Sequence, residues 1–246
     1  MDGLTLALFL FSVFFGGIVS GLAGFAMGLV VSGIWLHILT PAQTAALIVG
    51  YGLLVQTYSI WKLRHALNWR TVAPFIAGGV IGVPLGAAVL TLINPDYLRT
   101  AVGVLLVAYS SFFLLRPTVH TIRTDIRADF GIGIVNGILG GMTGLAGPII
   151  TIWCQLRGWR KDEQRAIFQP VILAAFILTA TSLTVNGTIT IELLKIYAMG
   201  LPLLAAGVWV GLKLYGHLDE MAFRKVILYL LLLSGIVLIV PMSVFG

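Results

Sequence analysis

Long runs of apolar residues, separated by short polar connections, dominate the pattern of the chain. Eight such runs stand out, at 4–39, 44–61, 71–93, 98–115, 130–156, 166–185, 192–212 and 222–244. About 20 mostly apolar residues suffice for one membrane-spanning helix. The sequence lacks the ten-residue alternating stretches that are typical of a membrane β-barrel. The pattern therefore predicts an all-α polytopic membrane protein.

The two halves of the chain resemble each other. Shifted by 116 positions, GIVSGLAGFAMGL (Gly17–Leu29) aligns with GIVNGILGGMTGL (Gly133–Leu145), and seven of thirteen positions are identical. A weaker echo pairs Gly79-Val80 with Gly207-Val208. Glycine-rich membrane helices can match through composition alone, but here the matches that are not glycine are in register too. We therefore predict two membrane repeats of four hydrophobic segments each, over 1–116 and 130–246, joined by a cytoplasmic linker at 117–129.

The basic residues favour one topology for these repeats. If all eight segments cross the membrane once, the 15 Lys and Arg divide 7 against 8 between the two sides. If the segments at 4–39 and 130–156 each turn back as glycine-broken hairpins, the division is 13 against 2, with Arg99 and Lys195 on the poorer side. Positive residues accumulate in cytoplasmic loops. This favours inverted-topology repeats in a multi-pass protein of the cell (inner) membrane, with both termini on the non-cytoplasmic side.

The composition limits the classes of function. The chain is 59% hydrophobic and 10% charged, and its mean hydropathy is +1.04, which is too high for an ordinary soluble domain. The net charge of +6 then indicates cationic loops beside a lipid bilayer, and no nucleic-acid partner is expected. The single cysteine, Cys154, excludes an intrachain disulfide, and the sequence contains no HExxH pair or Ser/His/Asp set. We expect no enzyme activity, metal site or cofactor.

Glycine and proline gather at matching places in the first segment of each half. Broken helices at equivalent positions of two repeats indicate a transporter's binding site, because their freed backbone groups can face a ligand. Helix N-termini at such breaks suit an anion. The candidate substrate-binding residues of the two segments are Ser20, Gly21, Gly24, Gly28, Asn136, Gly137, Gly140, Gly141, Thr143, Gly144 and Pro148.

Both the glycines and three further polar residues have a simpler explanation. Gly17/Gly21, Gly24/Gly28 and Gly140/Gly144 have the small-xxx-small spacing of closely packed membrane helices. Tyr51, Gln56 and Gln169 lie inside predicted spans, where each is a candidate ligand contact or an interhelical hydrogen bond.

Several stretches resemble the sulfite exporter TauE/SafE family of membrane permeases. They are GIVSGLAGFAMG, GIVNGILGGMTGLAGPII, TPAQTAALIVGY, DEQRAIFQP, GGVIGVPLGAAVL and NPDYLRTAVGVLLV, and together they cover essentially the whole chain. The resemblance implies a transporter of sulfite or a small organosulfonate, with the two glycine motifs as its site. The first half departs from the fuller pattern, with Phe25 where the second half has Gly141 and Ser32 where it has Pro148.

Together these features predict a secondary transporter that exports a small sulfur-containing anion, sulfite or an organosulfonate such as sulfoacetate, by alternating access. No Asp or Glu lies near the middle of a segment, so proton coupling has no obvious carrier, and the membrane potential can drive an anion outward. The alternative is an anion channel or a membrane scaffold whose glycines serve helix packing only. The expected partners are the small anionic substrate and the lipid bilayer, with a homodimer left open.

Overall fold

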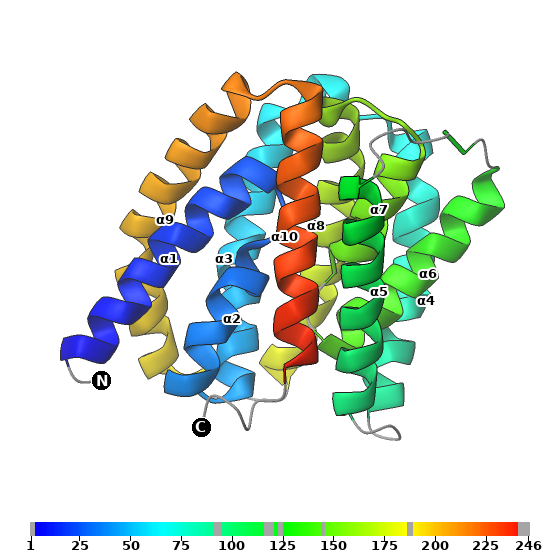
Figure 1. Cartoon of the computed structure of the whole chain (residues 1–246). Helices are drawn as coiled ribbons and strands as arrows, with labels where there is room; N and C mark the ends of the chain where they lie inside the picture. The colour runs from blue at the N-terminus through cyan, green and yellow to red at the C-terminus, as the bar shows by residue number, and fades with distance from the viewer. Residues whose placement is uncertain are drawn as a thin grey trace.

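The computed structural model describes residues 3–90, 95–115, 121–122, 125–143, 146–185 and 189–240 (Figure 1). Its helices are α1 (Gly3–Ala23), α2 (Met27–Ile38), α3 (Pro41–Lys62), η1 (Arg64–Ala66), α4 (Trp69–Leu90), α5 (Pro95–Leu115), α6 (Ile126–Thr143), α7 (Pro148–Leu156), α8 (Lys161–Val185), α9 (Ile191–His217) and α10 (Glu220–Ile239). These described residues contain no β-strand. The all-α fold class is therefore confirmed.

The outer surface of the helix bundle is apolar. Four helices are long and apolar enough to cross a membrane, over Gly3–Ala23, Gln43–Lys62, Lys161–Thr181 and Ile191–His217. Large apolar side chains such as Phe11 and Trp209 are exposed on them, at 61% and 64%. A large exposed apolar surface is typical of contact with lipid. The chain is a membrane protein.

Polar caps set where several helices begin. Thr40 and Gln43 form a capping box at α3: the Gln43 N–H donates to the Thr40 hydroxyl at 3.3 Å, and the Thr40 N–H donates to the Gln43 side chain at 3.1 Å. Thr190 and Asp219 accept backbone N–H groups in the same way at α9 and α10. Each cap pairs a backbone donor that the first helical turn leaves unpaired.

Two helix pairs pack through glycines. α1 lies against α9, and α6 lies against α4. A Cβ on Gly207 would lie 2.2 Å from the Phe14 carbonyl oxygen, and one on Gly78 would lie 2.2 Å from the Phe130 carbonyl oxygen. The glycines at the closest approach are Gly17, Gly21, Gly207 and Gly211 in the first pair and Gly78, Gly82, Gly86, Gly133 and Gly137 in the second. These helices approach so closely that no larger residue fits between them.

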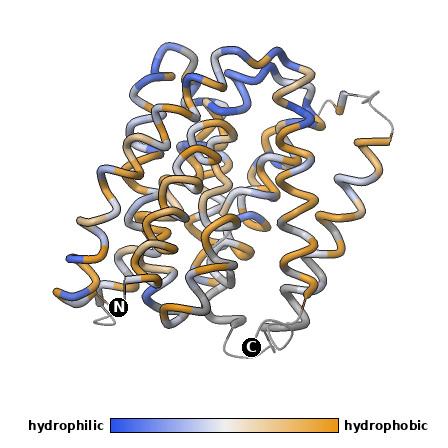
Figure 2. The backbone as a smooth tube through the Cα atoms, turned by 60° about the vertical axis from the view of Figure 1, so that its left-hand side comes forward, coloured by the Kyte–Doolittle hydropathy of each residue, from blue (hydrophilic) through white to orange (hydrophobic). Residues whose placement is uncertain are grey.

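The two ends of the bundle differ in polarity. In Figure 1, α1 begins and α10 ends at the lower end, which we call the terminal end. The turns between α3 and α4, α7 and α8, and α9 and α10 lie at the upper end, where hydrophilic residues gather in Figure 2. We call this the polar end. α6 begins there at Ile126, within the range 117–129 that was expected to link the halves.

Both long first segments are split into two helices. α1 rises from the terminal end and α2 returns to it, whereas α6 descends from the polar end and α7 returns to it (Figure 1). We call these pairs hairpin 1 and hairpin 2. In hairpin 1 the first helix ends at Ala23 and the second begins at Met27, and in hairpin 2 the first ends at Thr143 and the second begins at Pro148. These ends fall beside the glycines singled out in the sequence.

Candidate functional site

Hairpin 1 breaks at a glycine with an unusual backbone. α1 ends at Ala23, and Gly24 then adopts a φ of +90°, while its N–H donates to the Ser20 carbonyl at 2.7 Å. This left-handed conformation is one that glycine adopts without steric cost. A Cβ on Gly24 would also lie 2.8 Å from Cε2 of Phe168. The break therefore depends on glycine for both its backbone conformation and its space.

Hairpin 2 breaks differently. Pro148 occupies the first position of α7, where its missing N–H is not needed. The Asn136 side chain, from α6, donates to the Ala146 carbonyl at 3.0 Å and accepts from the Ile150 N–H at 3.2 Å. One amide thus pairs two backbone groups that the interruption leaves without helical partners. Both ends of the Asn136 amide are engaged within the hairpin.

The two breaks contact each other in the centre of the bundle. A Cβ on Gly147 would lie 3.0 Å from Cβ of Phe25, so the start of α7 packs directly on the break of hairpin 1. The Phe25 ring meets Phe168 of α8 edge-on, with 5.9 Å between ring centroids. Phe25, Phe168 and Ile150 belong to one buried apolar cluster with residues of α3, α4, α5 and α10.

Polar side chains from α3 and α8 converge on the first break. Gln56 Nε2 donates to the Gly24 carbonyl at 2.8 Å. Gln169 is fully buried, and its amide is among the atoms nearest to Gly24. Both glutamines predicted from the sequence therefore lie at the same break. The Gln56 Oε1 atom is buried without a hydrogen-bond partner in the described structure.

A buried cation at this break was missed by the sequence reasoning, which counted it among the loop cations. Arg165 of α8 is completely buried, and its Nη1 donates to the Gly21 carbonyl at 3.0 Å. That carbonyl is in the last turn of α1, where acceptors lack helical partners and the helix dipole favours a cation. A signal was present: Arg165, Phe168 and Ile172 are spaced as one helix face.

The remaining candidate residues fall into distinct environments. Gly21 and Gly137 face the backbones of α9 and α4, Gly140 faces Ala146 across its own break, and Ser20, Gly28 and Pro148 are buried. Gly141 is half-buried in the last turn of α6. Gly144 and the side chain of Thr143 lie outside the described residues.

Tyr51 lies in a different part of the core from the two glutamines. Its hydroxyl donates to the Tyr197 carbonyl at 3.0 Å, and the Tyr197 hydroxyl donates back to the Gly50 carbonyl at 3.1 Å. The two rings stack with 4.6 Å between centroids. Tyr51 belongs to the buried cluster around Trp35, whereas Phe25 belongs to the other cluster. The geometry here is that of an interhelical hydrogen bond between α3 and α9.

Each hairpin is also held together by a tryptophan, which the sequence reasoning did not single out. In hairpin 1, Trp35 Nε1 donates to Ser12 Oγ at 2.7 Å. In hairpin 2, Trp153 Nε1 donates to Asp129 Oδ1 at 2.9 Å. Arg157 pairs with the same Asp129 oxygen at 3.0 Å. The signal was an Ile-Trp dipeptide at 34–35 and again at 152–153.

Metal ligands do not gather within the described residues, where no group of three or more His, Cys, Asp or Glu side chains could hold an ion. The chemistry available at the first break is therefore that of amides, carbonyls and one guanidinium.

Comparison with known proteins agrees with the resemblance seen in the motifs. The sequence profile of the family described as "Sulfite exporter TauE/SafE" matches residues 9–238. A protein from Cupriavidus necator, described as "Probable sulfite/organosulfonate exporter TauE", is 23% identical over 228 residues, covering 89% of this chain and 87% of that protein. No solved structure matches the chain significantly. The predicted membership is confirmed, and this helical membrane protein belongs to the sulfite exporter TauE/SafE family.

Proposed function

We propose that the protein exports a small sulfur-containing anion, sulfite or an organosulfonate such as sulfoacetate, across the cell membrane by alternating access. The observation that carries this proposal is the contact between the two breaks, where Phe25 meets Gly147 inside an apolar bundle. Irregular backbone is tolerated at membrane depth only where it is buried in protein or lines a water-filled cavity. In transporters, such paired breaks are where substrates bind. The family description and the relative's printed name support the choice of cargo.

The arrangement of helices supports two repeats of inverted topology. Gly17 and Gly21 pack on α9 as Gly133 and Gly137 pack on α4, and these positions differ by the same 116 residues. α1 and α6 run in opposite directions along the bundle (Figure 1). On this basis we assign the repeats to 1–116 and 130–246, with rocking of one against the other as the transport movement.

The distribution of charge supports one orientation in the membrane. Hydrophilic residues gather at the polar end (Figure 2), and the loops and helix ends assigned to that side, with the buried Arg165 included, carry 13 of the 15 basic residues. We therefore place the polar end in the cytoplasm and both termini outside. Whatever the orientation of the protein, a membrane potential that is negative inside drives an anion outward.

Within this site, the first break is the better candidate for contact with the anion. Gln56, Gln169 and Gly24 converge there, whereas Asn136 engages its amide within hairpin 2. Gly28, Gly140, Gly141 and Pro148 shape the two breaks and have no side-chain donor.

One observation favours a second candidate, a channel or scaffold in which glycines serve packing. Gly21 and Gly137 lie against neighbouring backbones, so these two positions have a structural role whatever the chain transports. A channel and a transporter differ in kinetics, because a transporter saturates with substrate and a channel does not over the same range.

Flux measured on the full chain, purified and reconstituted into phosphatidylethanolamine–phosphatidylglycerol vesicles, tests the proposal. Sulfite, sulfoacetate and chloride are compared with protein-free vesicles, with and without a pH gradient and with an imposed potential. We expect saturable flux of sulfite or sulfoacetate that exceeds chloride flux, responds to the potential and does not need the pH gradient. Equal flux of the three anions, or none above protein-free vesicles, would contradict the transporter.

A further inference from the structure

Arg165 is a buried charge whose described hydrogen-bond partners are all neutral. Its Nη1 donates to the Gly21 carbonyl at 3.0 Å. With the Gln169 amide turned so that its oxygen faces the guanidinium, that oxygen accepts from Nε at 3.0 Å and from Nη2 at 2.9 Å. Among the described residues, no carboxylate oxygen lies within 4.0 Å of a guanidinium nitrogen of Arg165. Neutral oxygens thus make the direct contacts to this charge, and Asp162 acts on it only from more than 4.0 Å away.

Such a charge is costly and calls for an explanation. Burying an ion without an opposite charge is strongly unfavourable, and ionisable residues inside membrane segments are usually functional. Arg157 provides the contrast, because Asp129 balances its charge at 3.0 Å. At Arg165 the compensation comes from carbonyl dipoles, from the face of Tyr215, whose ring centroid lies 4.3 Å from Cζ, and from Asp162 at longer range. No carboxylate touches the guanidinium, so an anion in direct contact would still be favoured there.

The position of this charge joins it to the break. Gly21 lies in the last turn of α1, and the Gln169 amide lies beside Gly24. Phe168, next to Gln169 in α8, contacts Phe25, which touches hairpin 2 at Gly147. A short series of contacts, through Gln169, Phe168 and Phe25, therefore connects the guanidinium to the point where the two hairpins meet.

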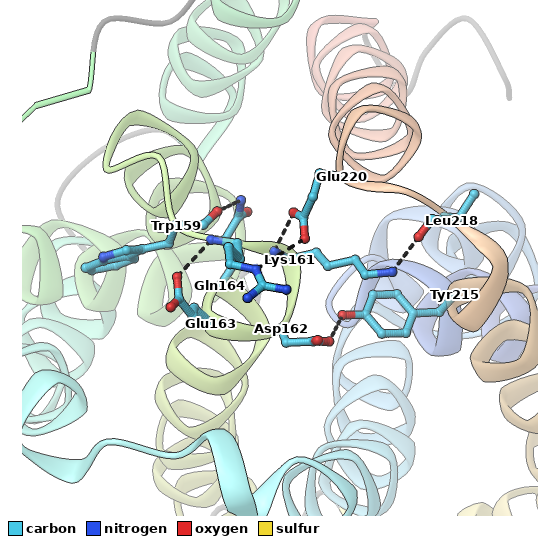
Figure 3. Close-up of polar contacts among 9 residues, drawn as sticks. Trp159, Lys161, Asp162, Glu163, Gln164, Tyr215, Leu218 and Glu220 are labelled. Atoms are coloured by element: carbon cyan, nitrogen blue, oxygen red, sulfur yellow. Dashed lines mark hydrogen bonds and ion pairs between the residues drawn. The ribbon is translucent and has the colours of Figure 1, made fainter.

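Tyr215 covers the guanidinium, and residues of the polar end hold it in place. The Tyr215 hydroxyl donates to Asp162, and Lys161 Nζ donates to the Leu218 carbonyl while lying 4.9 Å from the Tyr215 ring centroid (Figure 3). The Lys161 N–H donates to Glu220 at 2.7 Å, which ties the start of α8 to the start of α10. Movement of Tyr215 would expose Arg165 toward this end of the molecule.

We propose that Arg165 is the substrate-binding residue that recognises the oxyanion head of the cargo, and that Tyr215, held by Asp162, closes the site toward the polar end. This inference rests on the proposed export of a sulfur-containing anion. A planar guanidinium presents paired N–H donors that match two oxygens on one sulfur, as in sulfite or a sulfonate. The anion replaces the neutral Gln169 oxygen at Nε and Nη2, because hydrogen bonds to an ionised acceptor are about twice as strong as those to a neutral one.

The sharpest test places a negative charge of the protein in direct contact with Arg165. Gln169→Glu places a carboxylate where the Gln169 oxygen accepts from Arg165, so it competes with the anion while keeping the shape of the side chain. We expect the melting temperature of the purified protein to stay equal or rise, and the KM for sulfite to rise about tenfold or more. An unchanged KM in Gln169→Glu would contradict contact between the anion and Arg165. If Arg165 serves only to hold α1 against α8, sulfite raises the melting temperature of Arg165→Lys as much as that of the wild type.

Two further variants complete the design. Arg165→Lys keeps the charge but loses the paired donors, so sulfite should raise its melting temperature less than it raises that of the wild type. Gln43→Glu is the matched control, because it adds the same charge in the α3 capping box, where Glu is also favoured, and it should leave the KM unchanged.

The outcomes separate this inference from the proposed function. Wild-type flux of sulfite or sulfoacetate with an unchanged KM in Gln169→Glu would overturn the role of Arg165 and leave the exporter standing. Absence of saturable anion flux in the wild type would overturn the exporter, and the inference with it.

Discussion

At residue scale, the backbone of Gly24 controls the first break. Its φ of +90° is costly for any residue with a Cβ, and that Cβ would lie 2.8 Å from the Phe168 ring and 2.9 Å from the Gln169 amide. A non-glycine residue in such a conformation costs about 1–3 kcal/mol. We therefore expect Gly24→Ala to destabilise the protein by at least that amount, measured as a lower melting temperature in detergent.

Gly131→Ala is the matched control for this prediction. Gly131 is in α6, and a Cβ there would meet no atom within 4 Å. Alanine is a better helix former than glycine by up to about 1 kcal/mol, so this variant should melt at the same temperature or higher. Equal melting temperatures for the two variants would show that Gly24 is not under the constraint described here.

The glycines also show what a sequence can and cannot predict for single residues. Gly17, Gly21 and Gly24 look alike in the pattern, and their grouping correctly located the interruption. The first two, however, pack on α9, and only Gly24 has the positive φ. The difference depends on which face of α1 meets a helix almost 190 residues later, which the local sequence does not encode. Arg165 was missed because a charge near a segment end resembles a loop residue until its partners are known.

At the scale of elements, each hairpin is closed by a hydrogen bond from a tryptophan to the helix beside it. The acceptor in hairpin 1 is the neutral hydroxyl of Ser12, whereas the acceptor in hairpin 2 is the carboxylate of Asp129. A net hydrogen bond is worth about 0.5–1.5 kcal/mol between neutral groups and about 1.5–3 kcal/mol to a charged one. We expect the coupling energy of Asp129 and Trp153 to exceed that of Ser12 and Trp35.

Double-mutant cycles measure these coupling energies, because the packing energy that each single substitution removes is subtracted in the cycle. One cycle combines Ser12→Ala with Trp35→Phe, and the other combines Asp129→Ala with Trp153→Phe. A control cycle pairs Ser12→Ala with Trp69→Phe, whose ring is exposed at the start of α4, and its coupling should be near zero. Equal coupling in the two hairpins would argue against the charge of Asp129 as the source of the difference.

The ends of the helices agree closely with the ends of the hydrophobic runs. The residue-by-residue alignment of the two halves does not agree as well with the contacts in the structure. The run at 44–61 is α3 and the run at 192–212 is α9, each within a few residues. The echo between the halves, by contrast, pairs Gly79 with Gly207. In the structure Gly78 makes the contacts equivalent to those of Gly207, because the side of α4 that faces α6 carries Gly78 and Gly82. Matching identical residues aligns Gly79 with Gly207, whereas the helix faces that are in contact align Gly78 with Gly207.

At the scale of the whole molecule, the candidate site depends on contacts between segments that are far apart in the chain. Phe25 and Gly147 lie 122 positions apart, and Arg165 reaches a carbonyl 144 positions earlier in the chain. The hydrophobic pattern locates the membrane segments, and the count of basic residues suggests on which side of the membrane each loop lies. Neither shows which helices pack against each other. The class of fold and the two breaks could therefore be predicted, whereas the meeting of the breaks and the buried cation required the tertiary structure.

The orientation of the bundle is open to direct labelling, because the chain has a single native cysteine, Cys154, and it is buried. His65 is exposed in the turn between α3 and α4 at the polar end, and Ile189 is 43% exposed just before α9 at the other end. With the polar end in the cytoplasm, a membrane-impermeant maleimide should label Ile189→Cys on intact cells and His65→Cys only after permeabilisation. The wild type, whose cysteine is shielded, measures the background. Labelling of His65→Cys on intact cells would place the basic loops outside and contradict the orientation proposed here.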